Sequence, residues 1–260
     1  MVRGLVVRFL AGFVVAVVLG LSAAAALATF VRWRSEPRDP LTRAAMAADA
    51  GRLRTLLGVA GPRAASEQVN SFGAAGFTPL DWAARQGRVE AIRLLLAAGA
   101  EVDLHDRGPN GWTALMHALH KGQFQAAAAL LAAGADPNAR ARRGVTPLML
   151  VAGDGNPALV AMLLAAGADP RAENGGTTAL TNAVAEGDPE VVRLLLRAAP
   201  DVRLHDTFQD HAAVWLARLR GRTAALRLVG ETEKTEEEPG RGGAAPPPQQ
   251  PAQPVREARR

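Results

Sequence analysis

Between residues 76 and 206, apolar positions form short helical stripes that glycines separate. Leu80 and Ala84 lie on one face of a helix that Gly87 ends, and a second apolar stripe follows over residues 89–96. Each predicted helix is about two turns long, which is too short to be stable alone in water. The pattern therefore predicts pairs of short helices that are stable only when they stack on neighbouring pairs.

This pattern recurs at steps of 35, 33 and 32 residues. Each unit opens with a glycine, a variable residue and Thr-Pro-Leu or Thr-Ala-Leu, at residues 76–80, 111–115, 144–148 and 176–180. A further glycine follows eleven residues after each opening, and a Leu-Leu-rich segment such as LLAAGADPN closes the unit. Three signatures within one fixed period predict a solenoid of stacked repeats.

The residue types explain the start and end of each first helix. In the first unit, Thr78 can cap the helix through its hydroxyl, and Pro79 then occupies the first helical position, where its missing N–H costs nothing. Gly87 permits the left-handed turn that ends the helix.

The openings TPLDWAA, TALMHAL, TPLMLVA and TALTNAV resemble the T-P-L-H-x-A-A signature of the ankyrin repeat family. The resemblance implies an all-α ankyrin repeat solenoid, built of helix-turn-helix repeats with short hairpin loops. It is strong from about residue 76 to 206 and weaker over 41–70 and 210–230, which we expect to be degenerate caps. The family's usual histidine, which is structural, is replaced here by Asp81, Met116, Met149 and Thr181. This departure places the stability of the helix starts in question, and the fold is unaffected.

An uncharged apolar segment of 23 residues precedes the repeats, from Phe9 to Val31. As a helix it would span about 35 Å, slightly more than a bilayer core requires. The sequence therefore predicts one N-terminal transmembrane helix or signal anchor. We divide the chain into a basic tail at 1–8, the span at 9–31, a linker at 32–40, the ankyrin repeat domain at 41–230 and a disordered tail at 231–260.

Two alternatives remain for this segment. The small-residue triplet Ala26-Leu27-Ala28 is also compatible with a cleaved signal peptide, which would release a soluble secreted or periplasmic protein. Arginines flank both ends of the span, so the charge rule for orientation nearly cancels. Because the leading tail is very short, we expect it in the cytoplasm. The expected location is a bacterial inner membrane, crossed once, with the repeats on the periplasmic side.

Composition narrows the possible functions. The chain contains no cysteine, which excludes disulfide scaffolds, thiolate metal sites and cysteine nucleophiles. Its net charge of +5 is concentrated around the apolar segment, and residues 44–230 are nearly neutral. Flanking charge beside a membrane span explains this distribution better than nucleic-acid binding does. We therefore expect no nucleic-acid partner.

The family resemblance implies that a protein partner binds at the hairpin tips and along the first helix of each repeat. Trp and Arg dominate the binding energy of many interfaces, so Trp82, Trp112 and Arg85 form the leading candidate cluster. The alternative is that both tryptophans merely cover neighbouring repeats. The complete set of candidates is Phe77, Trp82, Arg85, Gln86, Trp112, His117, His120, Lys121, Arg142, Arg143, Asp154, Asn182 and Glu186. The turn at residues 106–110 is two residues longer than its counterpart, which reflects either a ligand-reaching finger or neutral drift.

Known catalytic and cofactor motifs are absent from the sequence. There is no phosphate-binding G-x-x-x-x-G-K loop, no G-x-S-x-G elbow and no H-E-x-x-H. His117 and His120 share a helix face, but no carboxylate close in sequence completes a catalytic or metal site with them. We therefore expect a non-catalytic protein-binding module with no cofactor, no metal and no small-molecule substrate.

Overall fold

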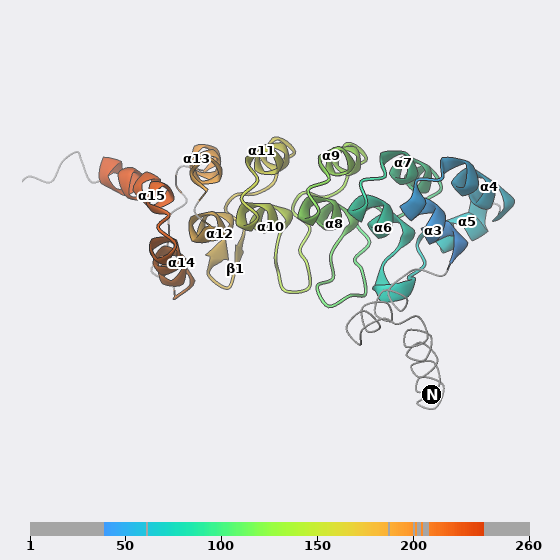
Figure 1. Cartoon of the computed structure of the whole chain (residues 1–260), viewed down its shortest axis with the longest axis horizontal. Helices are drawn as coiled ribbons and strands as arrows, with labels where there is room; N and C mark the ends of the chain where they lie inside the picture. The colour runs from blue at the N-terminus through green and yellow to red at the C-terminus, as the bar shows by residue number, and fades with distance from the viewer. Residues whose placement is uncertain are drawn as a thin grey trace, which may run out of the picture.

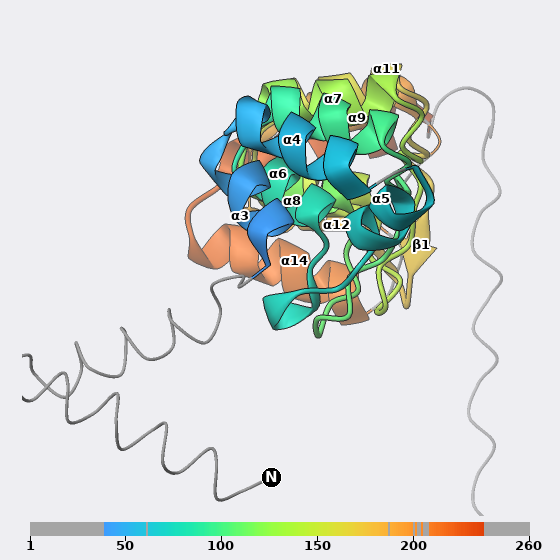
Figure 2. The ribbon, with the colours of Figure 1, turned by 90° about the vertical axis from the view of Figure 1, so that its right-hand side faces the viewer.

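The computed structural model is an elongated stack of helix pairs (Figure 1). The two helices of each pair run antiparallel, so the stack has an inner row and an outer row of helices. The structure describes residues 39–236 except 61, 187, 200, 202–203 and 205–207. The inner row comprises α3 (Pro40–Ala47), α6 (Pro79–Arg85), α8 (Ala114–His120), α10 (Pro147–Gly153), α12 (Ala179–Glu186) and α14 (Phe208–Leu219). The outer row comprises α4 (Ala50–Ala60), α7 (Val89–Ala97), α9 (Phe124–Ala132), α11 (Pro157–Ala165), α13 (Pro189–Ala198) and α15 (Thr223–Glu236). Seen along its length, the stack has the outer helices on one side and the loops that join successive repeats on the other (Figure 2).

The inner helices start as the sequence predicts. The hydroxyls of Thr78, Thr113 and Thr146 accept hydrogen bonds from the third backbone N–H of α6, α8 and α10, at 3.1, 3.5 and 3.3 Å. Asp81, which replaces the usual histidine, adds a second bond, since its carboxylate accepts from the Thr78 N–H at 2.8 Å. The first repeat therefore has a complete capping box, and its helix start is well satisfied.

A continuous apolar core lies between the two rows. Each inner helix of the clear repeats contributes a leucine that is at most 2% exposed: Leu80, Leu115, Leu148 and Leu180. The outer helices contribute Ile92, Leu130, Leu163 and Leu195, which are at most 3% exposed. Every repeat packs on the repeats before and after it. The predicted solenoid is therefore confirmed, and each pair of helices is stabilised by its neighbours.

The loops between repeats form hairpin-like fingers that are hydrogen-bonded to one another. Gly76 O accepts from the Arg107 N–H at 2.9 Å, and Asn110 O accepts from the Arg142 N–H at 2.8 Å. The last clear finger contains a short antiparallel pair, β1 (Glu173–Asn174) and β2 (Thr177–Thr178). These bonds fix the spacing of the finger row along the stack.

Both terminal units differ from the regular repeats. The N-terminal unit has a third helix, α5 (Pro62–Val69), followed by a short 3-10 turn, η1 (Ala74–Gly76). At the other end, α15 continues to Glu236, so residues 231–236 are helical although we assigned them to the tail. These six residues are mostly glutamate and lysine with threonine, and the charged types favour helix.

Residues 1–38 and 237–260 lie outside the described part of the chain. The predicted basic tail, the apolar segment 9–31, most of the linker and most of the C-terminal tail therefore remain predictions. Within residues 39–236, none of the described helices combines the length and the apolar character needed to cross a bilayer.

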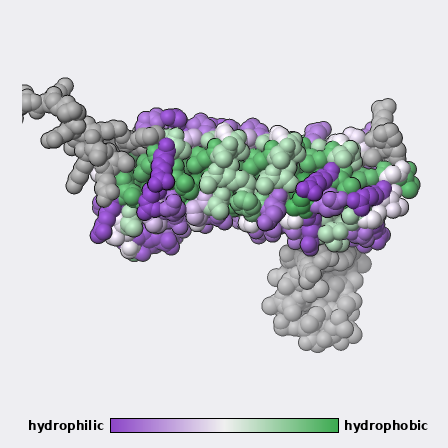
Figure 3. Space-filling view, turned by 90° about the horizontal axis from the view of Figure 1, so that it is seen from above, coloured by the Kyte–Doolittle hydropathy of each residue, from purple (hydrophilic) through white to green (hydrophobic). Residues whose placement is uncertain are grey.

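The outer row is apolar in the middle and charged toward its ends (Figure 3). Helices α9 and α11 contain no charged residue. By contrast, α7 and α13 each carry a Glu–Arg pair one turn apart, formed by Glu90 with Arg93 and by Glu190 with Arg193. Ionic side chains therefore mark the two ends of this face.

Candidate protein-binding surface

Five aromatic side chains form a row where the first two fingers meet α6 and α8. The ring centroid of Phe77 lies 5.3 Å from that of Trp82 and 4.6 Å from that of His117, edge to face in both cases. The Trp112 ring lies 5.4 Å from His117 and 5.0 Å from His120. The row therefore connects the two repeats and runs from the interior at Trp82 to the surface at His120.

Only part of this row is accessible. Trp82 is 9% exposed and His117 is 2% exposed, whereas Phe77 and Trp112 are half-buried and His120 is exposed. Our assignment of Trp82 and His117 to the binding surface is therefore wrong. Both side chains lie on the face of the inner helix that packs against neighbouring groups, so they are core residues. Trp112 and Phe77 cover them.

A buried ion pair fixes the longer second finger. His117 Nε2 lies 2.8 Å from Asp106 Oδ2, and both side chains are almost completely buried. Asp106 also accepts from the Gly108 N–H at 2.8 Å, while its own N–H donates to Trp112 O at 2.8 Å. This pair was not predicted from the sequence, because its only signal there is an aspartate at the start of the enlarged turn. The turn is therefore anchored to the core at its first residue.

A second buried carboxylate lies beside this pair. Burial raises the pKa of Asp81 to about 6, although His117 and the hydrogen bonds from Thr78 act to lower it. Burial also acts to raise the pKa of Asp106, but the hydrogen bond from His117 and its charge outweigh burial and lower that pKa below its ordinary value. Asp81 Oδ1, Trp82 Nε1 and His117 Nδ1 are buried and have no hydrogen-bond partner.

The candidates that are exposed, together with half-buried Arg85 and Glu186, gather at the C-terminal ends of the inner helices. We call this set the inner strip; it consists of Arg85 and Gln86 on α6, His120 and Lys121 on α8, Asp154 on α10 and Glu186 on α12. Partial desolvation raises the pKa of Asp154, with the charge of Glu186 acting in the same direction and that of His120 in the opposite one. The three groups are therefore close enough to sense one another's charge.

The inner strip changes sign along the stack. Arg85 and Lys121 form no ion pair with any described residue, and the carboxylates of Asp154 and Glu186 follow them on the next two repeats. Glu186 is bound by Arg220 at 3.1 Å, which leaves Asp154 as the more available acid. A partner that lies along the strip would therefore meet a basic half and then an acidic half.

The remaining candidates divide between the surface and the fold. Arg142 and Arg143 are exposed at the tip of the third finger, as predicted. Asn182 is half-buried, and its amide donates to Met149 O at 3.0 Å. This bond joins two neighbouring repeats, so Asn182 contributes to the stack, and its role as a binding residue stays a prediction.

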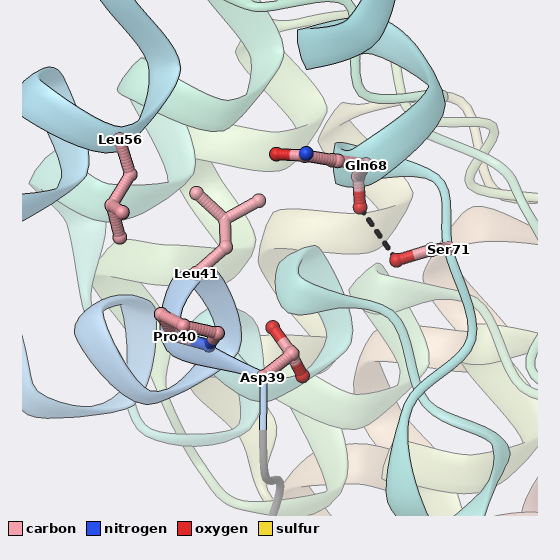
Figure 4. A pocket seen from close by; sticks show the side chains of 6 residues that line it. All are labelled: Asp39, Pro40, Leu41, Leu56, Gln68 and Ser71. Carbon is pink, nitrogen blue, oxygen red and sulfur yellow. Dashed lines mark hydrogen bonds between the residues drawn. The ribbon is translucent and has the colours of Figure 1, made fainter. Parts of the chain in front are cut away.

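A pocket of about 290 Å³ lies in the N-terminal unit, lined by residues of α3, α4 and α5 and by Ser71 (Figure 4). Its carboxylate, Asp39, accepts from the Thr42 N–H at 2.6 Å and so caps α3. The Ser71 hydroxyl donates to Gln68 O at 2.7 Å. Among the residues that the structure describes, no three His, Asp or Glu side chains gather in a way that could hold a metal ion.

Comparison with known families agrees with this architecture. A family model for ankyrin repeats, in three copies, matches residues 41–141 and 134–206, which is more than half of the chain. The chain belongs to the ankyrin repeat family. No curated protein matches the sequence.

Membership of the ankyrin repeat family defines the general class of activity. Ankyrin repeats are typically protein–protein interaction modules, and the family is generally non-catalytic. The buried Asp106–His117 pair is consistent with this class, since it joins a finger to the core and does not face a cleft. The partner is not specified by the family, so the exposed residues of this chain carry the rest of the argument.

Proposed function

We propose that this ankyrin repeat array is a non-catalytic binding module that holds a protein partner along the concave side formed by the fingers and the inner helices. The observation that carries the proposal is the inner strip, in which successive repeats present exposed polar groups at the same register. Half-buried Trp112 adjoins the strip through His120, with ring centroids 5.0 Å apart. An aromatic group beside unpaired charges is the composition expected of an interface centre.

A charge-reversal experiment tests this proposal. The array, carrying an affinity tag, is cross-linked in its native cells, and the captured partners of the wild type and of variants are compared by mass spectrometry. Lys121→Glu combined with Arg142→Glu and Arg143→Glu reverses exposed charges that pack against nothing in the core. We expect the specific partner to be lost while the thermal unfolding curve stays the same.

The matched control reverses an exposed charge on the outer row. Arg197→Glu changes α13, which is on the opposite side of the stack from the fingers (Figure 1). The control should retain the partner. If Arg197→Glu removes the partner as completely as the triple variant does, or if neither does, the concave side is not the binding site.

We also propose that residues 9–31 tether the array to a bacterial inner membrane, with the repeats in the periplasm. The support is the sequence: 23 consecutive uncharged residues with arginines on both flanks. A tether would raise the local concentration of a membrane or envelope partner. Protease added to intact spheroplasts that carry a C-terminally tagged copy should digest the tag and the repeats. Survival of the repeats until the membrane is lysed would place them in the cytoplasm.

The alternative is a soluble secreted or periplasmic protein, such as an effector or a toxin-neutralising immunity protein. Ala26-Leu27-Ala28 favours it, because small residues at this spacing suit a signal peptidase. Sequencing the N-terminus of the mature protein separates the two. A start near Thr29 supports release, whereas an intact Met1 or Val2 supports the tether.

A further inference from the structure

The last inner helix, α14, leaves a large apolar face uncovered. Trp215 and Leu219 are 63% and 67% exposed and lie four residues apart, so they share one side of the helix. Ala213 and Ala217 are at most 4% exposed and lie on the opposite side, where α14 packs on α12. Trp215 and Leu219 therefore lie on the side of α14 that faces away from α12, and α14 is the last inner helix at the C-terminal end of the stack (Figure 1).

The repeat register shows that this face is a stacking surface. Trp215 is six residues before Gly221, as Thr181, Met149, Met116 and Asp81 are before the corresponding glycines of the earlier repeats. Those four side chains are 1–4% exposed. In each of these repeats, another unit of the stack follows. Trp215 occupies the same position with no further unit after it in the described chain.

This end departs from what a terminal repeat requires. A repeat that ends a solenoid normally has a polar outer face, because nothing covers it. At the N-terminal end, the exposed residues of α3 include Arg43, and α5 adds a further helix to that unit. The C-terminal unit instead presents the largest apolar side chain in the sequence to solvent. An unburied surface of this kind marks an interaction site.

Charge indicates what covers this face. Residues 211–230 contain Arg218, Arg220, Arg222 and Arg227 and no acidic residue, while Asp210 precedes them on α14 and Glu231, Glu233 and Glu236 follow on α15. Arg220 is paired with Glu186, but the other three arginines are exposed and form no ion pair with a described carboxylate. A second copy that met this chain through the same C-terminal face would bring the two sets of Arg218 and Arg222 together, which is unfavourable. A partner with carboxylates beside an apolar stripe fits both features.

We propose that the exposed face of α14 docks an amphipathic helix of a partner protein, with its apolar stripe on Trp215 and Leu219 and its carboxylates toward Arg218 and Arg222. The helix would occupy the place that the inner helix of a following repeat would take, as α12 packs on α10 and α14 packs on α12. This surface is separate from the inner strip, so the inference goes beyond the function proposed above.

Site-specific photo-cross-linking tests the occupant directly. The photoreactive residue p-benzoylphenylalanine replaces Trp215 in the full-length chain in its native cells, and the cross-linked peptide is sequenced. The control carries the same residue in place of Arg43, an exposed position at the other end of the array. We expect an adduct at position 215 and none at position 43. The attached peptide should have apolar residues at helical spacing with Asp or Glu beside them.

A second measurement tests the charge and the fold. Arg218→Glu with Arg222→Glu should lower the yield of the adduct at position 215 at least tenfold, while Arg43→Glu leaves it unchanged. Trp215→Ala should unfold at the same urea concentration as the wild type, because its side chain is mostly exposed. A large loss of stability would make Trp215 a structural residue and overturn the proposal.

Any other molecule bound to this face of α14 would give a different cross-linking result. An adduct to a second copy of this chain, or to its own residues 231–260, overturns the proposal and identifies the true cover. An adduct whose yield is insensitive to charge reversal contradicts the acidic edge. Loss of the partner through the triple variant of Lys121, Arg142 and Arg143, with the adduct at position 215 intact, would support the concave site and this one independently.

Discussion

Single side chains of the aromatic row differ in how far they are buried, and this decides what each contributes. Trp82 is 9% exposed and packs edge to face on Phe77. Trp112 is half-buried and adjoins exposed His120. Removing the first leaves a cavity in the core, whereas removing the second mostly takes away a surface contact.

We therefore predict that the two tryptophan substitutions lower stability to different extents. Trp82→Ala should lower the free energy of unfolding by about 3–5 kcal/mol, the usual cost of a large core deletion. Trp112→Ala should lower it by about 1 kcal/mol and reduce partner capture. Urea unfolding followed by circular dichroism measures the first effect. Equal losses of stability would show that Trp112 is also a core residue.

The buried carboxylate of Asp81 predicts a pH dependence. Its pKa is raised from 3.8 to about 6 by burial, so between these values the folded state binds more protons than the unfolded state. The contribution of Asp81 to stability therefore falls as the pH rises from about 4 to 6 and is constant above that range. Replacing it with a neutral group should remove this loss.

Asp81→Asn provides the measurement. The amide oxygen can still accept from Thr78, so the cap is retained. We expect the stability of Asp81→Asn relative to the wild type to increase by up to about 3 kcal/mol between pH 4 and pH 7. Asp106 does not interfere in this range, since its lowered pKa affects stability only at more acidic pH. A difference that is the same at every pH would contradict the assignment.

At the scale of elements, two glycines with the same left-handed backbone differ in how close the next repeat lies. Gly76 has a φ of +76°, and a Cβ there would lie 2.9 Å from the backbone carbonyl carbon of Arg107 in the next finger. Gly122, at the end of α8, has a φ of +64° and nothing within 4 Å of such a Cβ. The two glycines share the left-handed conformation and differ in their surroundings.

Alanine at these two glycines therefore separates the cost of the left-handed backbone from the cost of a steric clash with the next finger. Gly122→Ala should cost about 1 kcal/mol, which is the strain of a left-handed alanine alone. Gly76→Ala should cost about 1–3 kcal/mol more, because the next finger has to move and its hydrogen bond from Arg107 to Gly76 lengthens. Chemical denaturation of both variants gives the comparison. Equal costs would mean that the finger row spreads freely.

At the scale of the whole molecule, stability depends on neighbours, because each repeat contacts the repeats beside it. Hydrogen exchange should therefore be slowest in α8 and α10, which are covered on both sides, and faster in α3 and α15. A chain that ends at residue 206 lacks α14 and α15. In that chain we expect faster exchange in α12 and α13 and little change in α8. Uniformly faster exchange would show that the array unfolds as one unit.

Much of the fold was predictable because its signals are local. Thr78, Pro79 and Gly87 specify the start and end of α6 through hydrogen bonding and backbone conformation, and the structure confirms them. The repeat period then extends this local rule to the other units. The extra helix α5 and the continuation of α15 were not predicted, since the terminal units lack the repeat signature.

The binding surface was predictable only in part. A position in the repeat gives the helix face, and it correctly placed His120, Lys121, Asp154 and the finger arginines at the surface. It failed for Trp82 and His117, because their burial depends on how Phe77, Trp112 and Asp106 in the preceding loops pack over them. The Asp106–His117 contact joins residues eleven apart across a turn whose length differs from that of the other repeats.

The sequence alone determined the repeat period, the paired short helices and their caps, because each depends on residues close together in the chain. Only the tertiary structure decided which candidate side chains lie in the core, that a buried carboxylate anchors the second finger, and that Trp215 is uncovered at the end of the stack. These outcomes depend on contacts across a finger or between repeats, which join residues from eleven to about 30 positions apart.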